Sequence, residues 1–170
     1  TRRVVLELAD GEFDPIEFVD VSTEQKLTLI SQLGEAVNHG HRYGLAHGAL
    51  SPSNVLVVEE GPSLRVADWD VTSRALGLTS PDIDAYGVSG DLKKLGVTQA
   101  ADIYAIGAVA YALFTGERVP SDPAEWRARL EEVEGISPDL ESALVAAVTV
   151  EDDEQYDTVL HLRDAIIQSL

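Results

Sequence analysis

Cysteine and methionine are both absent from this 170-residue chain. Without cysteine, the protein has no disulfide framework, no thiolate metal site and no cysteine nucleophile. Because methionine is missing as well, we expect Thr1 not to be the natural start and a further segment to precede it. No signal segment opens the chain, and no run approaches the ~18 apolar residues of a membrane span. We therefore expect a cytoplasmic protein with no membrane span in this chain.

Positive charge is scarce, because 12 Lys and Arg face 30 Asp and Glu, which gives a net charge of −18 and a pI near 4.3. Such a surface repels phosphate backbones, so the sequence predicts no nucleic-acid partner. The acidic residues are spread along the chain, and Arg is more frequent than Lys. This composition is typical of a halophilic protein in a high-salt cytoplasm, where the Debye length is about 3 Å at 1 M salt. An ordinary acidic bacterial domain is the alternative.

Hydrophobic residues make up 45% of the chain, which is enough for one core, and no repeat or low-complexity tract divides it. A short apolar run at residues 4–8 predicts a strand, and Asp10 and Gly11 predict a turn after it. Residues 12–21 are expected to form a loop or a short helix. A helix should then begin at Ser22 or Thr23 and end near Tyr43, because its apolar residues recur at helical spacing.

A β-branched run at residues 55–58 and a second strand at residues 64–67 predict a small hairpin with a loop of roughly five residues. Residues 68–98 are rich in turn residues and contain one short helical candidate at 91–95. We therefore expect little regular structure between the hairpin and the next apolar segment.

The segment from Gln99 to Thr115 is apolar on nearly every face and carries a single charge, Asp102. A helix that is apolar all round is buried on all sides, and this one is too short to span a bilayer. Three further helices are expected at about 122–133, 137–148 and 157–170. The predicted fold class is mainly α with a small β-hairpin.

Several stretches follow the order of motifs in the protein kinase family, and the chain resembles the C-terminal lobe of bacterial-type Ser/Thr kinases. The matching stretches are Val4 to Gly11, Gly44 to Val57, Val66 to Asp70, Asp102 to Gly116, and Val150 to Ala165. The resemblance implies that residues 1–21 form the last N-lobe strand, the hinge and the following loop. It also implies that residues 22–170 form a single kinase-like C-lobe, with no other part of the N-lobe in this chain.

The resemblance also assigns site residues. It implies a vestigial nucleotide site of Leu6 as gatekeeper, Glu7 and Ala9 on the hinge, and Leu56. A vestigial metal pair would be Asn54 in the catalytic loop and Asp68, which stands where the family has its Asp-Phe-Gly motif. The alternative is that Asn54 holds the loop backbone and Asp68 caps a turn.

Two other residues of the motifs are expected to be structural. The resemblance implies that Asp102 binds the backbone of the catalytic loop, and a carboxylate at the start of a helix is also favoured by the helix dipole. His47, at the start of that loop, is expected to be structural as well, together with His41. A histidine metal site is disfavoured, because His39 and His41 stand two residues apart and face different sides of a helix.

The catalytic loop departs from the family where the chemistry occurs. Phosphoryl transfer uses an Asp that accepts the hydroxyl proton and a Lys two residues later. The base position is held here by Ala49 and the Lys position by Ser51, while Gly48 replaces the Arg before the base. These changes predict that the chain is not an enzyme but a pseudokinase, with no catalytic residue. Mg-ATP is expected only where an N-lobe is present, because the chain has no Gly-rich loop, Lys strand or Glu helix.

The sequence therefore predicts a catalytically inactive kinase-like domain that serves as a binding or regulatory scaffold in signalling. The alternative is a degenerate Ser/Thr protein kinase that still binds Mg-ATP when its N-lobe is present, and a purely structural domain is a third option. An apolar face is expected beneath the hinge, around Leu8, Leu56 and Val66. Such a patch attracts a partner, so we expect a protein partner, another domain of the same protein, or self-association.

Overall fold

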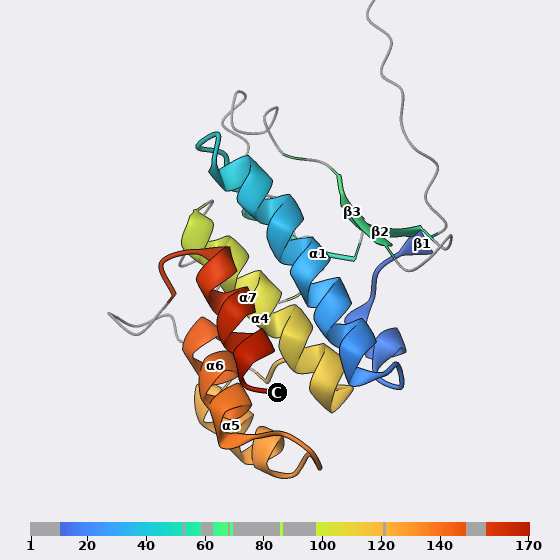
Figure 1. Ribbon diagram of the computed structural model, residues 1–170, viewed down its shortest axis with the longest axis vertical. Helices are drawn as coiled ribbons and strands as arrows, with labels where there is room; N and C mark the ends of the chain where they lie inside the picture. The colour runs from blue at the N-terminus through green and yellow to red at the C-terminus, as the bar shows by residue number, and fades with distance from the viewer. Residues whose placement is uncertain are drawn as a thin grey trace, which may run out of the picture.

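The computed structural model describes residues 11–52, 54–58, 63–67, 69, 86, 98–120, 122–148 and 156–170. Figure 1 shows a bundle of helices with a small sheet on one side. The helices are η1 (Pro15–Phe18, a 3₁₀ turn), α1 (Thr23–His41), α4 (Gln99–Thr115), α5 (Pro123–Glu131), α6 (Pro138–Val148) and α7 (Val159–Gln168). The strands are β1 (Gly11–Glu12), β2 (Val55–Val58) and β3 (Ser63–Val66). The predicted fold class, mainly α with a small sheet, is confirmed.

Helix α1 begins where its sequence provides a complete cap. The Ser22 hydroxyl accepts a hydrogen bond from the Gln25 backbone N–H at 3.2 Å, and the Gln25 side chain accepts one from the Ser22 N–H at 3.1 Å. This reciprocal pair satisfies two N–H groups that the first turn leaves without helical partners. The helix ends at His41, two residues earlier than expected, and Gly44 then adopts a positive φ of 72°. The early end leaves His41 in the last turn.

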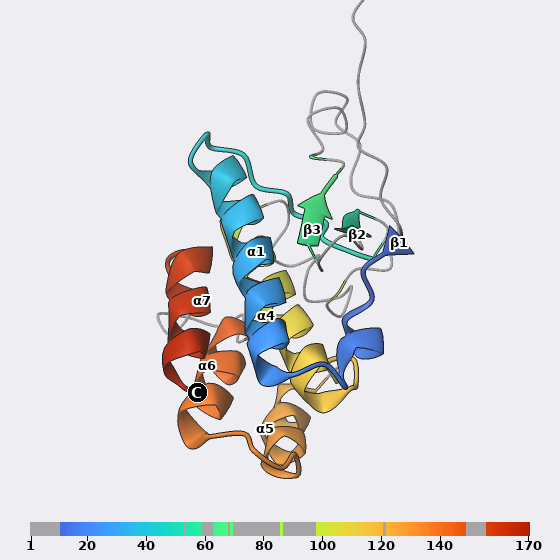
Figure 2. The ribbon, with the colours of Figure 1, turned by 45° about the vertical axis from the view of Figure 1, so that its right-hand side comes forward.

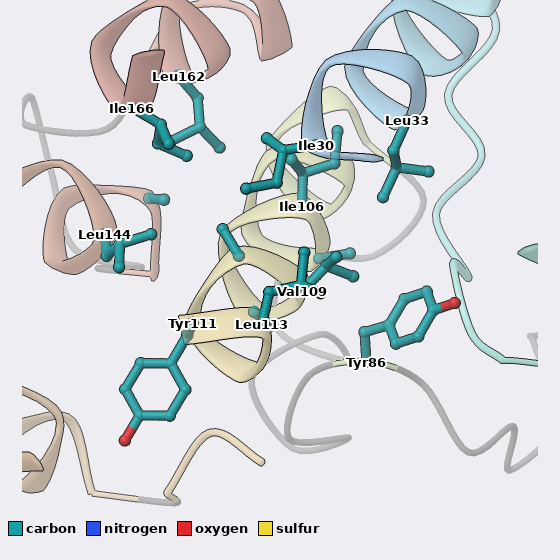
Figure 3. Packing of buried hydrophobic residues seen from close by; sticks show 14 of the residues in the cluster. Ile30, Leu33, Tyr86, Ile106, Val109, Tyr111, Leu113, Leu144, Leu162 and Ile166 are labelled. Atoms are coloured by element: carbon teal, nitrogen blue, oxygen red, sulfur yellow. The ribbon is translucent and has the colours of Figure 1, made fainter. Parts of the chain in front are cut away.

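Helix α4 is the centre of the molecule, and every residue from Ala101 to Leu113 is buried. It packs against α1, α6 and α7 (Figures 1 and 2). Figure 3 shows the side chains that fill this core: Ile30 and Leu33 from α1, Ile106 and Val109 from α4, Leu144 from α6, and Leu162 and Ile166 from α7. The all-round apolar pattern of α4 therefore corresponds to contact with helices on several sides.

Close approach of α4 and α6 depends on Gly107. A Cβ atom built at Gly107 would lie 2.5 Å from the Cβ of Ala147, closer than real Cβ atoms approach one another. The two backbones are thus nearer than a side chain at this position would allow.

The sheet is antiparallel, with the order β1-β2-β3, and it lies on the far side of α1 from α7 (Figure 2). Directly paired residues of an antiparallel sheet share a face, and successive residues alternate between faces. Val66 pairs with the buried Val55 and packs against the core, whereas Leu56 pairs with Arg65. Leu56 and Val66 therefore lie on opposite faces, and the expectation that they share one apolar patch is wrong.

Other expectations at the N-terminal end have mixed outcomes. Gly11, expected in a turn, pairs with Val57 in the sheet, and the N–H of Phe13, directly after the strand, donates to the Val55 carbonyl at 2.8 Å. The strand expected at residues 4–8, which includes Leu8, and the helical candidate at 91–95 lie outside the described residues.

None of the helices in the described ranges combines the length and apolar character needed to cross a membrane.

Candidate functional site

Asp102 accepts three hydrogen bonds in the first turn of α4, where its side chain is fully buried. Its Oδ2 accepts from the Nε2 of His41 at 2.7 Å and from the backbone N–H of His47 at 2.8 Å. Its Oδ1 accepts from the backbone N–H of Gly48 at 2.6 Å. One carboxylate therefore connects the end of α1, the start of α4 and the start of the segment from residue 47 to residue 54, which we call the loop segment.

His47 connects the loop segment to the chain after β3. Its ring is 1% exposed, and its Nε2 lies 2.9 Å from the carbonyl oxygen of Ala67. Because a carbonyl only accepts, Nε2 carries the proton, and Nδ1 is then free to accept from the backbone N–H of Ala49 at 3.3 Å. The ring also meets the indole of Trp69 edge-on, with centroids 5.1 Å apart.

Asn54 joins two backbone groups of the loop segment and is 5% exposed. Its Oδ1 accepts from the Ser51 N–H at 2.9 Å, and its Nδ2 donates to the Ala49 carbonyl at 2.6 Å. Both ends of the amide thus bind the loop backbone. This arrangement is the one expected from the sequence as the alternative to a metal-binding role for Asn54. A carbonyl oxygen has two lone pairs, so Oδ1 retains one for a further ligand.

The second residue of the suggested metal pair, Asp68, lies outside the described residues. Within the described part of the chain, no group of three or more His, Asp or Glu side chains is arranged to hold a metal ion. The metal pair therefore stays a prediction. So does the nucleotide site, because Leu6, Glu7 and Ala9 are outside the described residues, while Leu56 is half-buried in β2.

The two substituted catalytic positions differ in their surroundings. Ala49 is partly exposed, so a longer side chain there has access to solvent. Ser51 is 0% exposed, and its carbonyl accepts from the N–H groups of both Asn54 and Val55 at 3.1 Å. A long cationic side chain fits position 49 but not position 51 without a rearrangement of the loop segment.

Tyr86 also holds the loop segment, and sequence reasoning missed it. Its N–H donates to the carbonyl of Leu50 at 3.2 Å, and its hydroxyl donates to the carbonyl of Phe13 at 2.5 Å. The side chain, labelled in Figure 3, is 5% exposed. Burial, followed by the nearby carboxylate of Asp14, raises its pKa far above the usual value. A single Tyr within a turn-rich stretch carries no periodicity, so the sequence offered no signal for this contact.

Comparisons with known proteins relate the sequence and the fold of this chain to protein kinases. No protein-family model matches the chain. The probable kinase PglW of Streptomyces coelicolor is 30% identical over 165 residues, which cover 76% of this chain and 10% of PglW. The Ser/Thr-protein kinase PknB of Mycolicibacterium smegmatis is 24% identical over 191 residues, which cover 97% of this chain and 30% of PknB.

Solved structures give the same fold. The crystal structure of the Mycobacterium tuberculosis PknI kinase domain superposes with a TM-score of 0.69 at 21% identity, over 96% of this chain and 64% of that domain. The chain thus has the fold of a large part of a protein kinase domain. The relatives that it matches are named as kinases, PknB among them as a Ser/Thr kinase, and the resemblance stated from the motifs is confirmed.

These comparisons correct one prediction. From Ala49 and Ser51 the sequence predicted that the chain is not an enzyme, yet the relatives that it matches are named as kinases. The loss of two catalytic side chains is local to the loop segment, whereas the similarity extends over most of the chain. The motif departures alone therefore do not show that the chain is inactive.

Proposed function

We propose that this chain is the C-lobe of a degenerate Ser/Thr protein kinase domain that binds Mg-ATP together with an N-lobe and acts as a binding and regulatory module in signalling. The observation that carries the proposal is the hydrogen bonding of the loop segment. Asp102 holds the N–H groups at its start, and Asn54 bridges Ala49 and Ser51. Buried polar networks are costly when incomplete, so the hydrogen bonds that the described residues of this segment make support a loop kept in a defined conformation.

The proposed ligand agrees with the donor atoms near this loop. Magnesium takes oxygen ligands and is usually held by one or two protein side chains together with substrate phosphates. Asn54 has an amide oxygen with one remaining lone pair, and Asp68 would supply a carboxylate. The nucleotide phosphates would complete the coordination, which requires the residues of an N-lobe as well.

Phosphoryl transfer in the proposed domain would lack a general base at position 49. A positioned acid or base contributes roughly 10²–10⁴-fold to rate, so we expect slow transfer from the unaltered protein. Because Ala49 is partly exposed and its backbone is fixed by Asn54, position 49 is suited to receive a carboxylate.

The test uses the full-length protein that contains this chain. Calorimetry measures ATP binding with and without Mg²⁺, and radiolabel transfer to a peptide measures activity. We expect Mg²⁺-dependent ATP binding. The variant Ala49→Asp should raise the transfer rate by about 10²-fold or more without changing ATP affinity.

The control is Ala128→Asp, which adds the same charge to an exposed position of α5. It should change neither rate nor affinity. Absence of Mg²⁺-dependent ATP binding in the full-length protein would contradict the proposed function.

A further inference from the structure

In the last turn of α1, a glycine leaves room on the helix surface for an aromatic side chain. Gly40 is buried, and a Cβ built on it would lie 2.2 Å from Cζ3 and 2.4 Å from Cη2 of Trp69. Real Cβ atoms essentially never approach heavy atoms so closely. The indole thus occupies the space that any other residue at position 40 would fill.

Glycine within a helix is destabilising by roughly 1 kcal/mol relative to alanine. Gly40 has an ordinary helical conformation, since it is not among the glycines with positive φ. Close approach of Trp69 is therefore the physical reason for a glycine at this point of α1.

Trp69 and Ala67 are the chain neighbours of Asp68, and both contact His47. The His47 ring donates to the Ala67 carbonyl and meets the Trp69 ring edge-on. Trp69 thus lies between a histidine on the loop segment and a glycine on α1. The contacts on the two sides of Asp68 converge on elements that Asp102 already joins.

We propose that Gly40 is a positioning residue, which admits the Trp69 indole onto α1 and thereby fixes the chain directly after Asp68, while His47 holds Ala67 directly before it. The effect on metal binding rests on the proposed function, in which Asp68 is a magnesium ligand. The contact of Gly40 with Trp69 does not depend on that function.

The indole, rather than aromatic character in general, requires the glycine. The atoms that would overlap with a Cβ at position 40 belong to the six-membered ring of Trp69, at its outer edge. A phenylalanine ring is shorter than an indole. Trp69→Phe should therefore tolerate a methyl group at position 40, and the two substitutions should compensate for each other.

Fluorine NMR of protein labelled with fluorotryptophan tests the contact on the 170-residue chain. The chain contains two Trp residues, Trp69 and Trp126, so the Trp69→Phe variant assigns both signals. In Gly40→Ala we expect the Trp69 signal to shift or broaden. The signal of Trp126, buried between α4 and α5, should stay in place and report that the fold is intact.

Gly34→Ala is the matched control. It makes the same substitution in the same helix, where the new Cβ would meet only the Arg163 side chain, at an ordinary 3.7 Å. Neither signal should shift as in Gly40→Ala. An unmoved Trp69 signal in Gly40→Ala would overturn the proposal. If Gly40→Ala unfolds the chain, the double variant Gly40→Ala with Trp69→Phe decides, because a folded double variant supports the contact and an unfolded one contradicts it.

The second readout is ATP affinity of the full-length protein with and without Mg²⁺. Displacing residues that orient metal ligands typically costs 10–100-fold in metal affinity, so Gly40→Ala should weaken the Mg²⁺-dependent part by roughly tenfold and leave Mg²⁺-free binding unchanged. The double variant should recover most of the loss. A displaced Trp69 with unchanged Mg²⁺ dependence would overturn the positioning role. Absence of ATP binding in the unaltered protein would instead contradict the proposed function, and the NMR result would still decide whether Gly40 holds Trp69.

Discussion

His41 and Asp102, 61 residues apart in the sequence, form a part-buried hydrogen bond of 2.7 Å between the last residue of α1 and the first turn of α4. The same Asp102 carboxylate accepts the N–H groups of His47 and Gly48. The position of the loop segment is therefore set by the packing of the two longest helices of the described structure. A change at Asp102 should affect the loop segment and the helix pair together.

Asp102→Asn tests this coupling through stability. The amide keeps one oxygen but places an NH₂ group against donors, so at least one buried N–H loses its acceptor. Leaving buried donors unpaired, or breaking a buried pair, costs roughly 2–5 kcal/mol. Urea unfolding followed by circular dichroism should show a loss in this range.

Asp139→Asn is the control for that measurement. Asp139 also lies in the first turn of a helix, α6, but is exposed. A loss of roughly 0.3–1 kcal/mol is expected from the helix dipole alone. Equal losses in the two variants would show that the hydrogen bonds of Asp102 contribute nothing beyond the dipole.

The helices were largely predictable because their signals are local. The apolar run from Gln99 to Thr115 matches α4 at both ends, and Ser22 with Gln25 marks the start of α1 through a reciprocal cap. The end of α1 was predicted two residues late, since Arg42 and Tyr43 continue a helical composition while the backbone already turns toward Gly44. Local composition thus predicts that a helix exists better than it predicts the residue at which the helix ends.

The contacts across the site were not predictable from spacing. Strand β2 is apolar at every position, so no alternation showed that Val55 and Val57 face the core while Leu56 faces away. The contact between Asp102 and the loop was expected only through the resemblance to kinases. The hydrogen bonds of Tyr86 join segments distant in sequence, and nothing in the residues around Tyr86 indicates them.

Tyr86 gives a prediction for alkaline pH. Burial raises its folded-state pKa above the ordinary value of 10.0, so above pH 10 the unfolded chain loses a proton that the folded chain keeps. The contribution of Tyr86 is fully present below pH 10 and declines as pH rises further. The expected decline is about 1.4 kcal/mol of unfolding free energy per pH unit.

Tyr86→Phe separates this effect from the other titrating groups. The variant should be less stable by about 1 kcal/mol at pH 8, because the hydrogen bond to the Phe13 carbonyl is lost. Between pH 10 and 11, however, its unfolding free energy should fall less steeply than that of the unaltered chain, by about 1 kcal/mol over that pH unit. Urea unfolding at several pH values measures both slopes, and identical slopes would contradict a raised pKa at Tyr86.

Ser51→Lys restores the cationic residue that kinases have at this position, yet we expect it to damage the protein. Ser51 is fully buried, and burying an unpaired charge is among the largest single-residue penalties. We expect a loss of roughly 3 kcal/mol in urea unfolding. Ala49→Lys adds the same charge two residues earlier at a partly exposed position and should cost far less. Similar losses in both variants would mean that burial at position 51 is not the cause.

Gly107→Ala tests the close approach of α4 and α6. The new Cβ would lie 2.5 Å from the Cβ of Ala147 and 3.1 Å from Cγ1 of Val148. Overpacking of this kind costs typically 1–3 kcal/mol, although alanine in place of glycine returns about 1 kcal/mol of helix propensity. Since the overlap is with core atoms of another helix, we expect a net loss of stability in urea unfolding.

The double variant Gly107→Ala with Ala147→Gly identifies the contact responsible. Removing the Ala147 methyl removes the closest overlap, so the loss in the double variant should be smaller than the sum of the two single losses. Residues in contact typically show interaction energies of 0.5–3 kcal/mol in such a cycle. Here the interaction energy should reduce the loss, because each substitution partly offsets the other. Gly34→Ala provides the matched glycine-to-alanine change at a position with room for the methyl group and should not destabilise the chain. Additive losses in the cycle would contradict a direct overlap between positions 107 and 147, because substitutions without a shared contact add.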